Sequence, residues 1–262
     1  MPLTRGPHAP IEIFTEAPVP ANTPLIVTID GPAGTGKSTV ARALALRLGL
    51  DFLDTGAMYR AAAAVAIDQR LVDALEAGET ADLLERIIDA DLHFDWRTDP
   101  PAILAWDAPL DSRIREPDVT AVVSKVAKVR TIRKHMVQKQ RIIGHQHPRL
   151  VTEGRDQGSV VFPDAAVKFY LDAKPEVRAS RRAAQMRDAG KPVEVAQLLA
   201  QIVERDKIDS TREDGPLVCP SGAEIVDTSA LSLDEVIVIL ESITRARVAE
   251  HLASRPDEPT DG

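Results

Sequence analysis

Apolar residues along this chain gather in short continuous runs that alternate with stretches repeating every three to four residues. Residues 25–30 (Leu-Ile-Val-Thr-Ile-Asp) are apolar and β-branched, which is typical of a buried strand in a parallel sheet. In residues 39–48, Val40, Leu44 and Leu48 fall on one face of a helix that is rich in strong helix formers. The pattern predicts a strand followed by a helix at this point.

The same two patterns recur along the chain and predict an α/β fold with a core of parallel strands flanked by helices. Further strands are expected at 52–53, at 149–158 (ending in a polar turn), at 167–172 and at 223–228. Further helices are expected at 57–67, 81–90, 117–143 (one helix or two), 175–189, 193 to about 207 with a continuation toward 212, and 233 to about 248, where Ser232 is a capping signal.

A small antiparallel sheet is expected between these core elements. Residues 91–96 and 102–107 alternate between apolar and polar side chains, and the turn residues 97–101 separate them. Residues 110–115 are a candidate for a third short strand. Together they predict a β insert within the α/β core.

Residues 31–38 read Gly-Pro-Ala-Gly-Thr-Gly-Lys-Ser, which fits the P-loop pattern. Its glycines allow backbone N–H groups to turn inward around phosphate oxygens, and the following helix start adds its positive dipole end. Lys37 is expected to reach the β- and γ-phosphates of ATP or GTP, and the Ser38 hydroxyl to ligate Mg²⁺. The alternative, a glycine-rich turn that binds nothing, is disfavoured by the strand before it and the helix after it. The residues expected to bind the nucleotide are Gly31, Pro32, Ala33, Gly34, Thr35, Gly36, Lys37, Ser38 and Thr39.

Composition excludes several other classes of protein. The 262 residues are enough for one or two domains, and a net charge of 32 − 40 = −8 argues against a general nucleic-acid binder. The single cysteine, Cys219, excludes an internal disulfide framework and suits a reducing cytoplasm. No apolar run approaches transmembrane length. The proline-rich residues 1–24 are expected to form a disordered leader, and residues 253–262 a disordered tail.

Polar residues follow the short second strand, where the carboxyl ends of parallel strands face a ligand crevice. They are Asp54, Thr55, Tyr59 and Arg60, and a second substrate is one interpretation of them. The other is a helix cap with a solvated arginine.

Two further polar groups are open to two interpretations each. Glu153 and Asp156 at a strand end are candidates to contact substrate or a Mg²⁺-bound water, although Asp156 is equally a candidate partner for Arg155. The second group is spaced i, i+4, i+7 on a predicted helix, where it is either a pair of surface ion pairs or a carboxylate holding guanidinium groups over a polyphosphate. Its members are Arg205, Asp209 and Arg212.

Four segments besides the P-loop resemble those of the bacterial cytidylate (CMP/dCMP) kinase family. They read Asp-Thr-Gly-Ala-Met-Tyr-Arg at 54–60, Glu-Gly-Arg-Asp-Gln-Gly-Ser-Val-Val-Phe-Pro-Asp-Ala at 153–165, Glu-Arg-Asp-Lys-Ile-Asp-Ser-Thr-Arg at 204–212 and Val-Asp-Thr-Ser at 226–229. The resemblance covers about residues 25 to 245. It implies a single domain over 25–252 with a P-loop NTPase-type parallel sheet, an acceptor-binding subdomain at about 59–134 that carries the β insert, and a helical lid at about 176–207.

The resemblance also implies residue roles. In the family, the acceptor nucleotide is bound by positions that correspond here to Asp54, Thr55, Tyr59 and Arg60. Cytosine is recognised by positions that fall on Ser124, Arg133 and Asp156, although the alignment leaves Arg130 as an alternative to Arg133. Phosphate and sugar contacts fall on Arg155, Arg205, Asp209 and Arg212. The lid arginines are among Arg178, Arg181 and Arg182, of which Arg178 and Arg182 are expected to bind ATP. The catalytic residues that stabilise charge are Lys37, Arg155, Arg205 and Arg212.

The expected activity is ATP- and Mg²⁺-dependent phosphorylation of CMP and dCMP by a cytoplasmic monomer with no nucleic-acid or membrane partner. Another small acceptor, such as UMP, dTMP or shikimate, is the alternative within the same class. A regulatory P-loop ATPase is the alternative from a different class.

Overall fold

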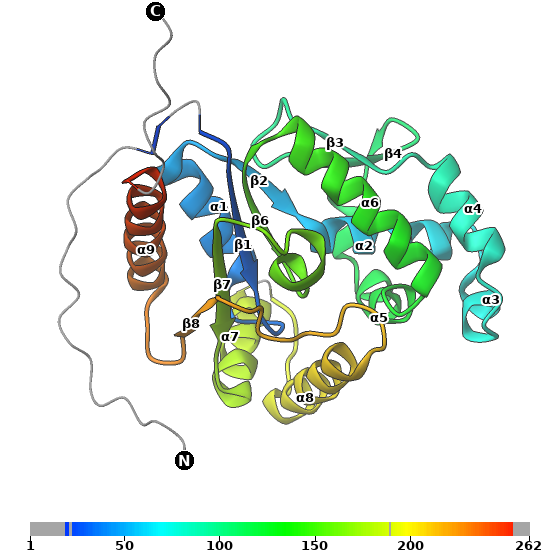
Figure 1. Cartoon of the computed structure of the whole chain (residues 1–262). Helices are drawn as coiled ribbons and strands as arrows, with labels where there is room; N and C mark the ends of the chain where they lie inside the picture. Colours follow the sequence, from blue (N-terminus) through cyan, green and yellow to red (C-terminus); the bar gives the residue numbers. More distant parts are fainter. Residues whose placement is uncertain (1–18, 21–22, 189, 254–262) are drawn as a thin grey trace, which may run out of the picture.

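The computed structural model describes residues 19–20, 23–188 and 190–253 of the chain. A five-stranded parallel sheet in the order β2-β6-β1-β7-β8 forms its centre (Figure 1). The predicted α/β fold is therefore confirmed. The strands are β1 (Leu25–Asp30), β2 (Asp51–Asp54), β6 (Arg149–Gly154), β7 (Val167–Asp172) and β8 (Glu224–Asp227).

The register of the sheet brings acidic strand ends together. Asp30 at the end of β1 is opposite Gly154, and Asp54 at the end of β2 is opposite Glu153 on β6. All four ladders of this sheet are parallel, so the carboxyl ends of the strands lie at the same end of the sheet. The helices α7 (Pro175–Asp188) and α8 (Val195–Thr211) lie beyond that end (Figure 1).

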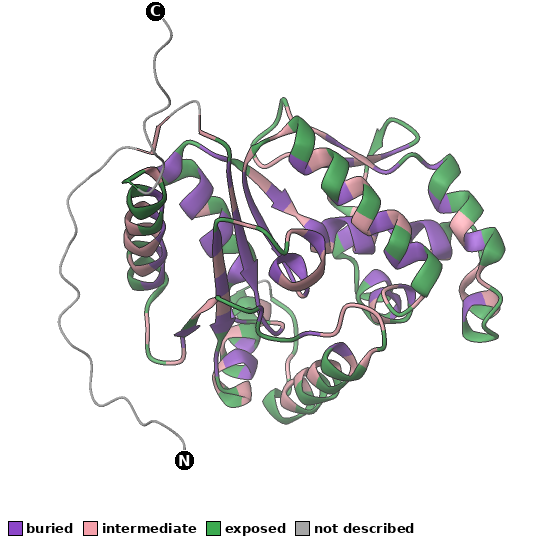
Figure 2. Ribbon diagram, viewed as in Figure 1, coloured by how far each residue is buried: buried purple, intermediate pink, exposed green. Residues whose placement is uncertain are grey.

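Two apolar clusters cover the sheet. One joins β1 and β7 to α1 (Lys37–Leu48) and α9 (Leu233–Ala253), with Phe169 and Leu44 fully buried. The other surrounds α2 (Thr55–Asp68), whose residues 61–64 are four buried alanines. Small side chains let neighbouring elements approach α2 closely on every side. Those neighbours include α4 (Ala81–Asp89), α5 (Pro117–Val126) and α6 (Arg130–Gln146), and α3 (Val72–Glu76) packs against α5. Figure 2 shows the buried residues concentrated on the central strands and on α2.

The β insert is present, with one correction. Strands β3 (His93–Asp95) and β4 (Ala102–Ala105) pair antiparallel as predicted, but the third strand is β5 (Ala108–Pro109) rather than 110–115. A two-residue turn at Trp106 and Asp107 starts β5 directly after β4. The chain then forms the short 3-10 helix η1 (Arg113–Arg115), which the sequence pattern did not distinguish from a strand.

Other differences concern the ends of elements. The segment 117–143 forms two helices, α5 and α6, separated by Ala127 to Val129, and the short helix α3 was not predicted. The polar turn after β6 continues into a π-helical turn, η2 (Gln157–Val161), which was also not predicted. The predicted cap of α9 is confirmed, because the Glu235 N–H donates to Ser232 Oγ and the Ser232 N–H to Glu235 Oε2.

An aromatic contact ties the insert to the edge of the sheet. The Trp96 ring, just after β3, stacks on the His147 ring with centroids 3.7 Å apart. His147 follows α6, and its Nδ1 lies 2.9 Å from an oxygen of Asp51 at the start of β2. The insert is thus held against β2 by a stacked ring and a polar pair.

The hairpin tip is a site of backbone strain. Trp106 has φ 47° and Asp107 has φ 61°, in the left-handed region where this kind of turn favours Asn-Gly. We expect Asp107→Gly to raise the free energy of unfolding by about 0.5–1 kcal/mol, because glycine adopts positive φ without strain. Urea denaturation measures it. Asp107→Ala is the control, since it deletes the carboxylate but keeps a Cβ. Equal stability of the two variants would contradict the prediction.

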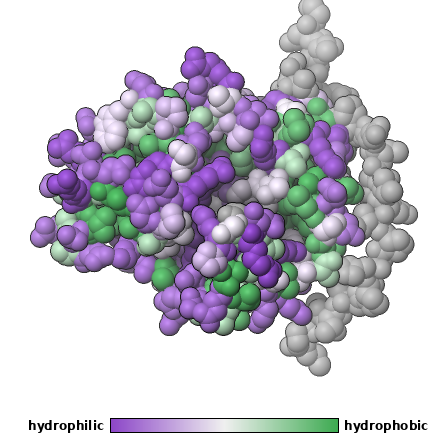
Figure 3. Space-filling view, turned by 180° about the vertical axis from the view of Figure 1, so that it is seen from behind, coloured by the Kyte–Doolittle hydropathy of each residue, from purple (hydrophilic) through white to green (hydrophobic). Residues whose placement is uncertain are grey.

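The expected leader and tail lie mostly outside the described residues. At the end of the leader, Val19 packs against the cluster around β1, and Arg149 Nη1 donates to Pro20 O at 2.6 Å and to Thr23 O at 2.9 Å. Packing against the domain therefore begins before Leu25. Among the described residues, no helix is long and apolar enough to cross a membrane. On the face seen in Figure 3, hydrophilic residues surround separate apolar patches.

Candidate active site

The P-loop connects β1 to α1 and requires glycine at its first position. A Cβ on Gly31, which has φ 147°, would lie 2.1 Å from the carbonyl oxygen of Leu171 on β7. Gly34 and Gly36 have φ 83° and 89°, again in the region that favours glycine. The loop therefore packs closely against the end of β7, and its backbone N–H groups lie next to the N-terminus of α1.

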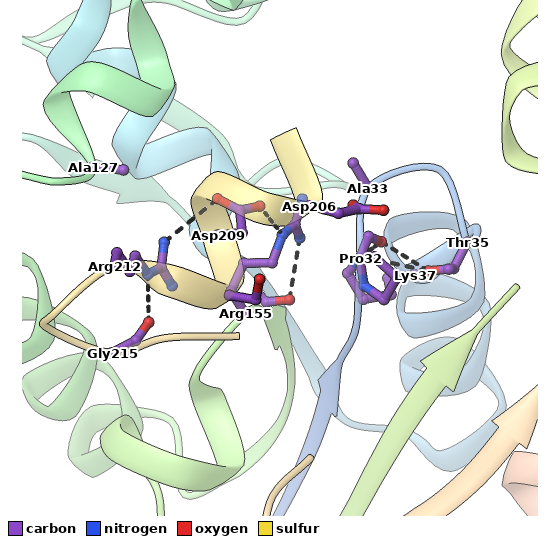
Figure 4. Close-up of polar contacts among 12 residues, drawn as sticks. Pro32, Ala33, Thr35, Lys37, Ala127, Arg155, Asp206, Asp209, Arg212 and Gly215 are labelled. Atoms are coloured by element: carbon purple, nitrogen blue, oxygen red, sulfur yellow. Dashed lines mark hydrogen bonds and ion pairs between the residues drawn. The ribbon is translucent and has the colours of Figure 1, made fainter. Parts of the chain in front are cut away.

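Lys37, the first residue of α1, is buried within this loop. Its Nζ donates to Pro32 O at 2.7 Å (Figure 4). Burial, together with the positive charges of Arg155 and Arg205, lowers the pKa of Lys37 to about 7. An anion bound here would stabilise the charged form of Lys37, so the site favours phosphate electrostatically.

Ser38 and Glu153 form an oxygen-rich corner beside the P-loop. Ser38 Oγ donates to Glu153 Oε1 at 2.7 Å. Burial and the nearby Asp54 raise the pKa of Glu153, so a cation at this corner would relieve the repulsion between the two carboxylates. Among the described residues no group of three or more His, Cys, Asp or Glu is arranged to hold a metal. This donor set fits Mg²⁺, which takes few protein ligands and completes its shell with water and phosphate oxygens.

The residues at the end of β2 make contacts among themselves. Asp54 accepts hydrogen bonds from the Ala57 N–H at 2.8 Å and from Arg60 Nη2 at 2.8 Å. It is therefore the cap of α2 and also the partner of Arg60. Thr55 is buried, and its hydroxyl donates to the Glu153 carbonyl at 2.7 Å, which joins β2 to β6.

Arg133 on α6 and Asp156 after β6 form a buried ion pair. Both residues are 4% exposed, and Arg133 Nη2 donates to Asp156 Oδ2. The Arg133 guanidinium also lies over the Tyr59 ring, 5.5 Å from its centroid. Arg130, the alternative in the sequence, has a side chain that is 65% exposed and faces Asp214. Asp156 therefore pairs with Arg133 and not with Arg155.

Gly215 closes over this pair. It has φ 56°, and a Cβ on it would lie 2.2 Å from Arg133 Nη2 and 2.4 Å from Asp156 Oδ2. A cavity of about 400 Å³ lies alongside, between α6, Val160 and residues 214–215. Four positively charged side chains and one carboxylate contribute to the lining of this cavity, so its electrostatic potential attracts anions. The charged lining residues are Arg130, Arg133, Lys134, Arg141 and Asp214. Ser124 is half-buried on α5.

Asp209 on α8 interacts with two arginines. It accepts a hydrogen bond from Arg155 Nε at 2.9 Å, and its Oδ1 lies 3.8 Å from Arg212 Nη1 (Figure 4). Arg212 lies just beyond the end of α8, in extended backbone with ψ 145°, so the expectation of a continuous helical face is wrong at this residue. Its Nε donates to Gly215 O, which turns the side chain back toward Asp209.

Several buried donors around this cluster have no hydrogen-bond partner among the described residues. Burial and Arg155 lower the pKa of Arg205 to about 10, and burial and Arg133 lower that of Arg212. Buried polar atoms without a partner are rare in proteins, and four of those here are donors, whereas Asp206 Oδ1 on α8 is an acceptor. Oxygens of an anionic ligand are the acceptors that fit these donors. The donors are Tyr59 OH, Arg60 Nε, Arg205 Nε and Arg212 Nη2.

The three candidate lid arginines of α7 lie in different environments. Arg178 is buried and donates to Ala33 O in the P-loop at 3.0 Å, to Ala173 O at 2.8 Å and to Asp206 on α8. Arg181 donates to Thr228 O at 2.6 Å, after β8, so it serves the packing of α7. Arg182 is exposed.

Sequence analysis missed two groups at this site. Asp30 is buried at the end of β1, and Asp206 on α8 accepts from Arg178. Asp30 had a signal, because it is a charged residue that ends an apolar strand directly before the P-loop. Asp206 had none, since its partner is 28 residues away in the sequence.

Comparisons with known proteins agree with this geometry. A family model described as cytidylate kinase matches residues 27–245. The cytidylate kinase of Corynebacterium efficiens is 41% identical over 222 residues, which cover 85% of this chain and 95% of that protein. The cytidylate kinase of Methylococcus capsulatus is also 41% identical, over 84% of this chain and 97% of its own length. A bifunctional pantoate ligase/cytidylate kinase of Parasynechococcus marenigrum is 44% identical over 88% of this chain, which matches 46% of that protein.

Proposed function

We propose roles for the site residues on the premise that the chain belongs to the cytidylate kinase family. It is a phosphotransferase that transfers the γ-phosphate of ATP to CMP or dCMP, giving ADP and CDP or dCDP. The observation that carries the assignment of the acceptor site is the buried pair of Arg133 and Asp156, at the same edge of the sheet as the P-loop.

ATP binds with its phosphates in the P-loop, between the backbone N–H groups of residues 31–39 and the ammonium of Lys37. Arg178 supports the loop from α7 through its bond to Ala33 O. Arg182 is exposed on the same helix, so closure of the lid formed by α7 and α8 would bring it to the ATP phosphates. Closure would also exclude water and limit hydrolysis of ATP.

CMP binds with its base against the Arg133–Asp156 pair. The N4 amine of cytosine is a donor and suits the Asp156 carboxylate, while O2 and N3 are acceptors and suit Arg133 and the Ser124 hydroxyl. Uracil would present a carbonyl oxygen to the carboxylate, which is repulsive. The Tyr59 ring beside Arg133 completes this wall of the pocket.

The CMP phosphate binds where the buried donors converge. Arg60 is held by Asp54 and keeps its Nε for a ligand, while Asp209 holds Arg155 and Arg212 and contacts the sugar. Arg205 supplies a further buried positive charge. These cations shield the acceptor phosphate, so that its oxygen can approach the γ-phosphorus of ATP.

The reaction needs no protein nucleophile. An oxygen of the CMP phosphate attacks the γ-phosphorus in line, and the O–P bond to ADP breaks. Lys37, Arg155, Arg205 and Arg212 stabilise the charge on the transferring group. Ser38 would hold Mg²⁺, with Glu153 and Asp54 as acceptors for its bound water, and the ion supplies neutralisation of phosphate charge.

A kinase for UMP, dTMP or shikimate is disfavoured by the carboxylate of Asp156 in the base pocket. A regulatory ATPase is disfavoured because the chain itself supplies the arginines that stabilise a transferring phosphate. A phosphotransferase needs these arginines within its own site. We further propose that the protein works as a monomer in the reducing cytoplasm, which its single cysteine suits, and in pyrimidine nucleotide metabolism.

A coupled assay of ADP formation from Mg-ATP tests this function. The acceptors would be CMP, dCMP, UMP, dTMP, AMP, GMP and shikimate, with a reaction lacking acceptor as the control. We expect strong rates with CMP and dCMP alone. Equal rates with UMP would refute the role of Asp156, and steady hydrolysis without dependence on acceptor would favour a regulatory ATPase.

A further inference from the structure

Asp30 is the last residue of β1 and directly precedes the P-loop. Its side chain is fully buried, and both carboxylate oxygens accept backbone hydrogen bonds from the segment after β6. The Gln157 N–H donates to Oδ1 at 2.8 Å, and the Gly158 N–H to Oδ2 at 2.7 Å. Asp30 therefore caps the start of η2 from a different strand, since Asp156 at the cap position of η2 makes no such bond with its own side chain.

The segment that Asp30 holds carries the residues assigned to acceptor binding. Arg155 and Asp156 immediately precede the two bonded amides. Gln157 is further held by a bond from Thr152 Oγ1 at 2.9 Å and by its own bond to Gln140 at 3.1 Å. These bonds fix the Gln157 side chain, whereas the side chain that bonds the backbone N–H groups of Gln157 and Gly158 is that of Asp30.

The segment after β6 packs closely against β1, and burial there disfavours the ionised form of the Asp30 carboxylate. A Cβ on Gly158 would lie 2.8 Å from Thr28 Oγ1, so β1 and the segment touch directly. Burial raises the pKa of Asp30 to about 7, although the two amides and Lys37 lower it. A buried carboxylate that destabilises the fold near neutral pH is typical of a functional position.

We propose that Asp30 is a positioning residue that fixes the cytosine-recognising segment 155–158 relative to the P-loop. It acts through the Gln157 and Gly158 amides, which set the backbone from which Asp156 reaches Arg133. Asp30 thereby contacts the segment that recognises CMP, while the next residue, Gly31, begins the P-loop that binds ATP. This role rests on the proposed function, because it concerns the base pocket for CMP.

Asp30→Asn tests the proposal, because it keeps the shape of the side chain but removes its charge and one acceptor oxygen. We expect KM for CMP to rise about tenfold, as for loss of one hydrogen bond to a charged group, and the preference for CMP over UMP to fall. KM for ATP should change by less than about twofold. Asp95→Asn is the matched control, since Asp95 also ends a strand and accepts a backbone N–H, that of Arg97 at 3.0 Å, but lies in the separate three-stranded sheet.

An unchanged KM and preference for CMP would overturn the proposal, as would a rise in KM for ATP equal to that for CMP. A second measurement needs neither substrate nor a stable variant. In the ligand-free wild-type protein, NMR should show the amide shifts of Gln157 and Gly158 changing together around pH 7, as Asp30 titrates. Gln157 and Gly158 amides that show no common titration at any pH would also overturn it.

Other titratable groups face Asp30 and must be separated from it. Asp156 and Lys37 interact with it electrostatically, and Asp30 in turn acts on Tyr170 of β7 and on Cys219. Lys37 also titrates near pH 7, so the amide shifts should persist in Lys37→Met and disappear in Asp30→Asn. If the wild-type protein failed to phosphorylate CMP, the proposed function would fail while the titration still tested the contact.

Discussion

Lys37→Ala is expected to lower kcat about 10³-fold at saturating ATP and CMP. The ammonium is buried at the start of α1, where the P-loop directs its N–H groups, and no other lysine among the described residues is buried. Its charge acts most strongly on the transferring phosphate, because the surrounding site is shielded from water. The coupled ADP assay measures the loss, and a near wild-type kcat would refute the P-loop assignment.

A second substitution at this position separates the role of Lys37 in activity from its effect on stability. Burial and the nearby arginines depress the pKa of Lys37, so the charged form destabilises the ligand-free fold. The unfolded chain binds more protons than the fold between about pH 7 and the ordinary lysine pKa. That cost is therefore complete below pH 7 and fades as the pH rises toward 10. Lys37→Met, which fills the same space, should keep or raise Tm at pH 7 while losing activity. A strong fall in Tm would show that Lys37 is structural.

Asp156→Asn should lower kcat/KM for CMP roughly 10- to 100-fold and raise the relative rate with UMP. The amide can donate to the C4 carbonyl of uracil, and it no longer neutralises Arg133. The buried guanidinium loses its charged partner, so Tm should fall as well. Steady-state kinetics with both acceptors and a thermal melt measure these effects.

Asp118→Asn is the control for Asp156→Asn. Asp118 also pairs with an arginine, Arg113 at 2.9 Å, but on the exposed surface beside η1. Its loss should leave kcat/KM for CMP within about twofold, since exposed ion pairs contribute little. If Asp156→Asn instead raised KM for ATP and spared CMP, Asp156 would belong to the donor site.

Local patterns were sufficient to predict most of the fold. The P-loop and its flanking strand and helix depend on neighbouring residues, so residues 25–48 predicted them directly. The pairing of Arg133 with Asp156 could not be derived from spacing, because Asp156 lies 23 positions further along the chain, beyond the rest of α6 and the whole of β6. The resemblance alone suggested Arg133, and it could not separate Arg133 from Arg130. In the fold, Arg133 is buried against Asp156, whereas Arg130 is exposed.

Tertiary contacts also give some of the predicted residues partners that their spacing in the sequence does not indicate. Thr55 was expected among the acceptor-binding residues, and the structure adds that its hydroxyl joins β2 to β6 through the Glu153 carbonyl. Arg181 looked like its neighbours on an arginine-rich helix, but it faces the end of β8. The strand expected at 110–115 was wrong because two residues with positive φ start β5 early, and nothing in Trp-Asp signals such a turn.

The tryptophans of the insert also give the protein an intrinsic fluorescent probe. Both tryptophans of the chain lie there, Trp96 stacked on His147 and Trp106 at the strained hairpin tip, and the P-loop and lid contain none. Intrinsic tryptophan emission therefore reports on the acceptor-binding side alone, with Trp96 sensing its contact with the edge of the sheet. Mixing experiments with either nucleotide can follow the movement of that subdomain without a label.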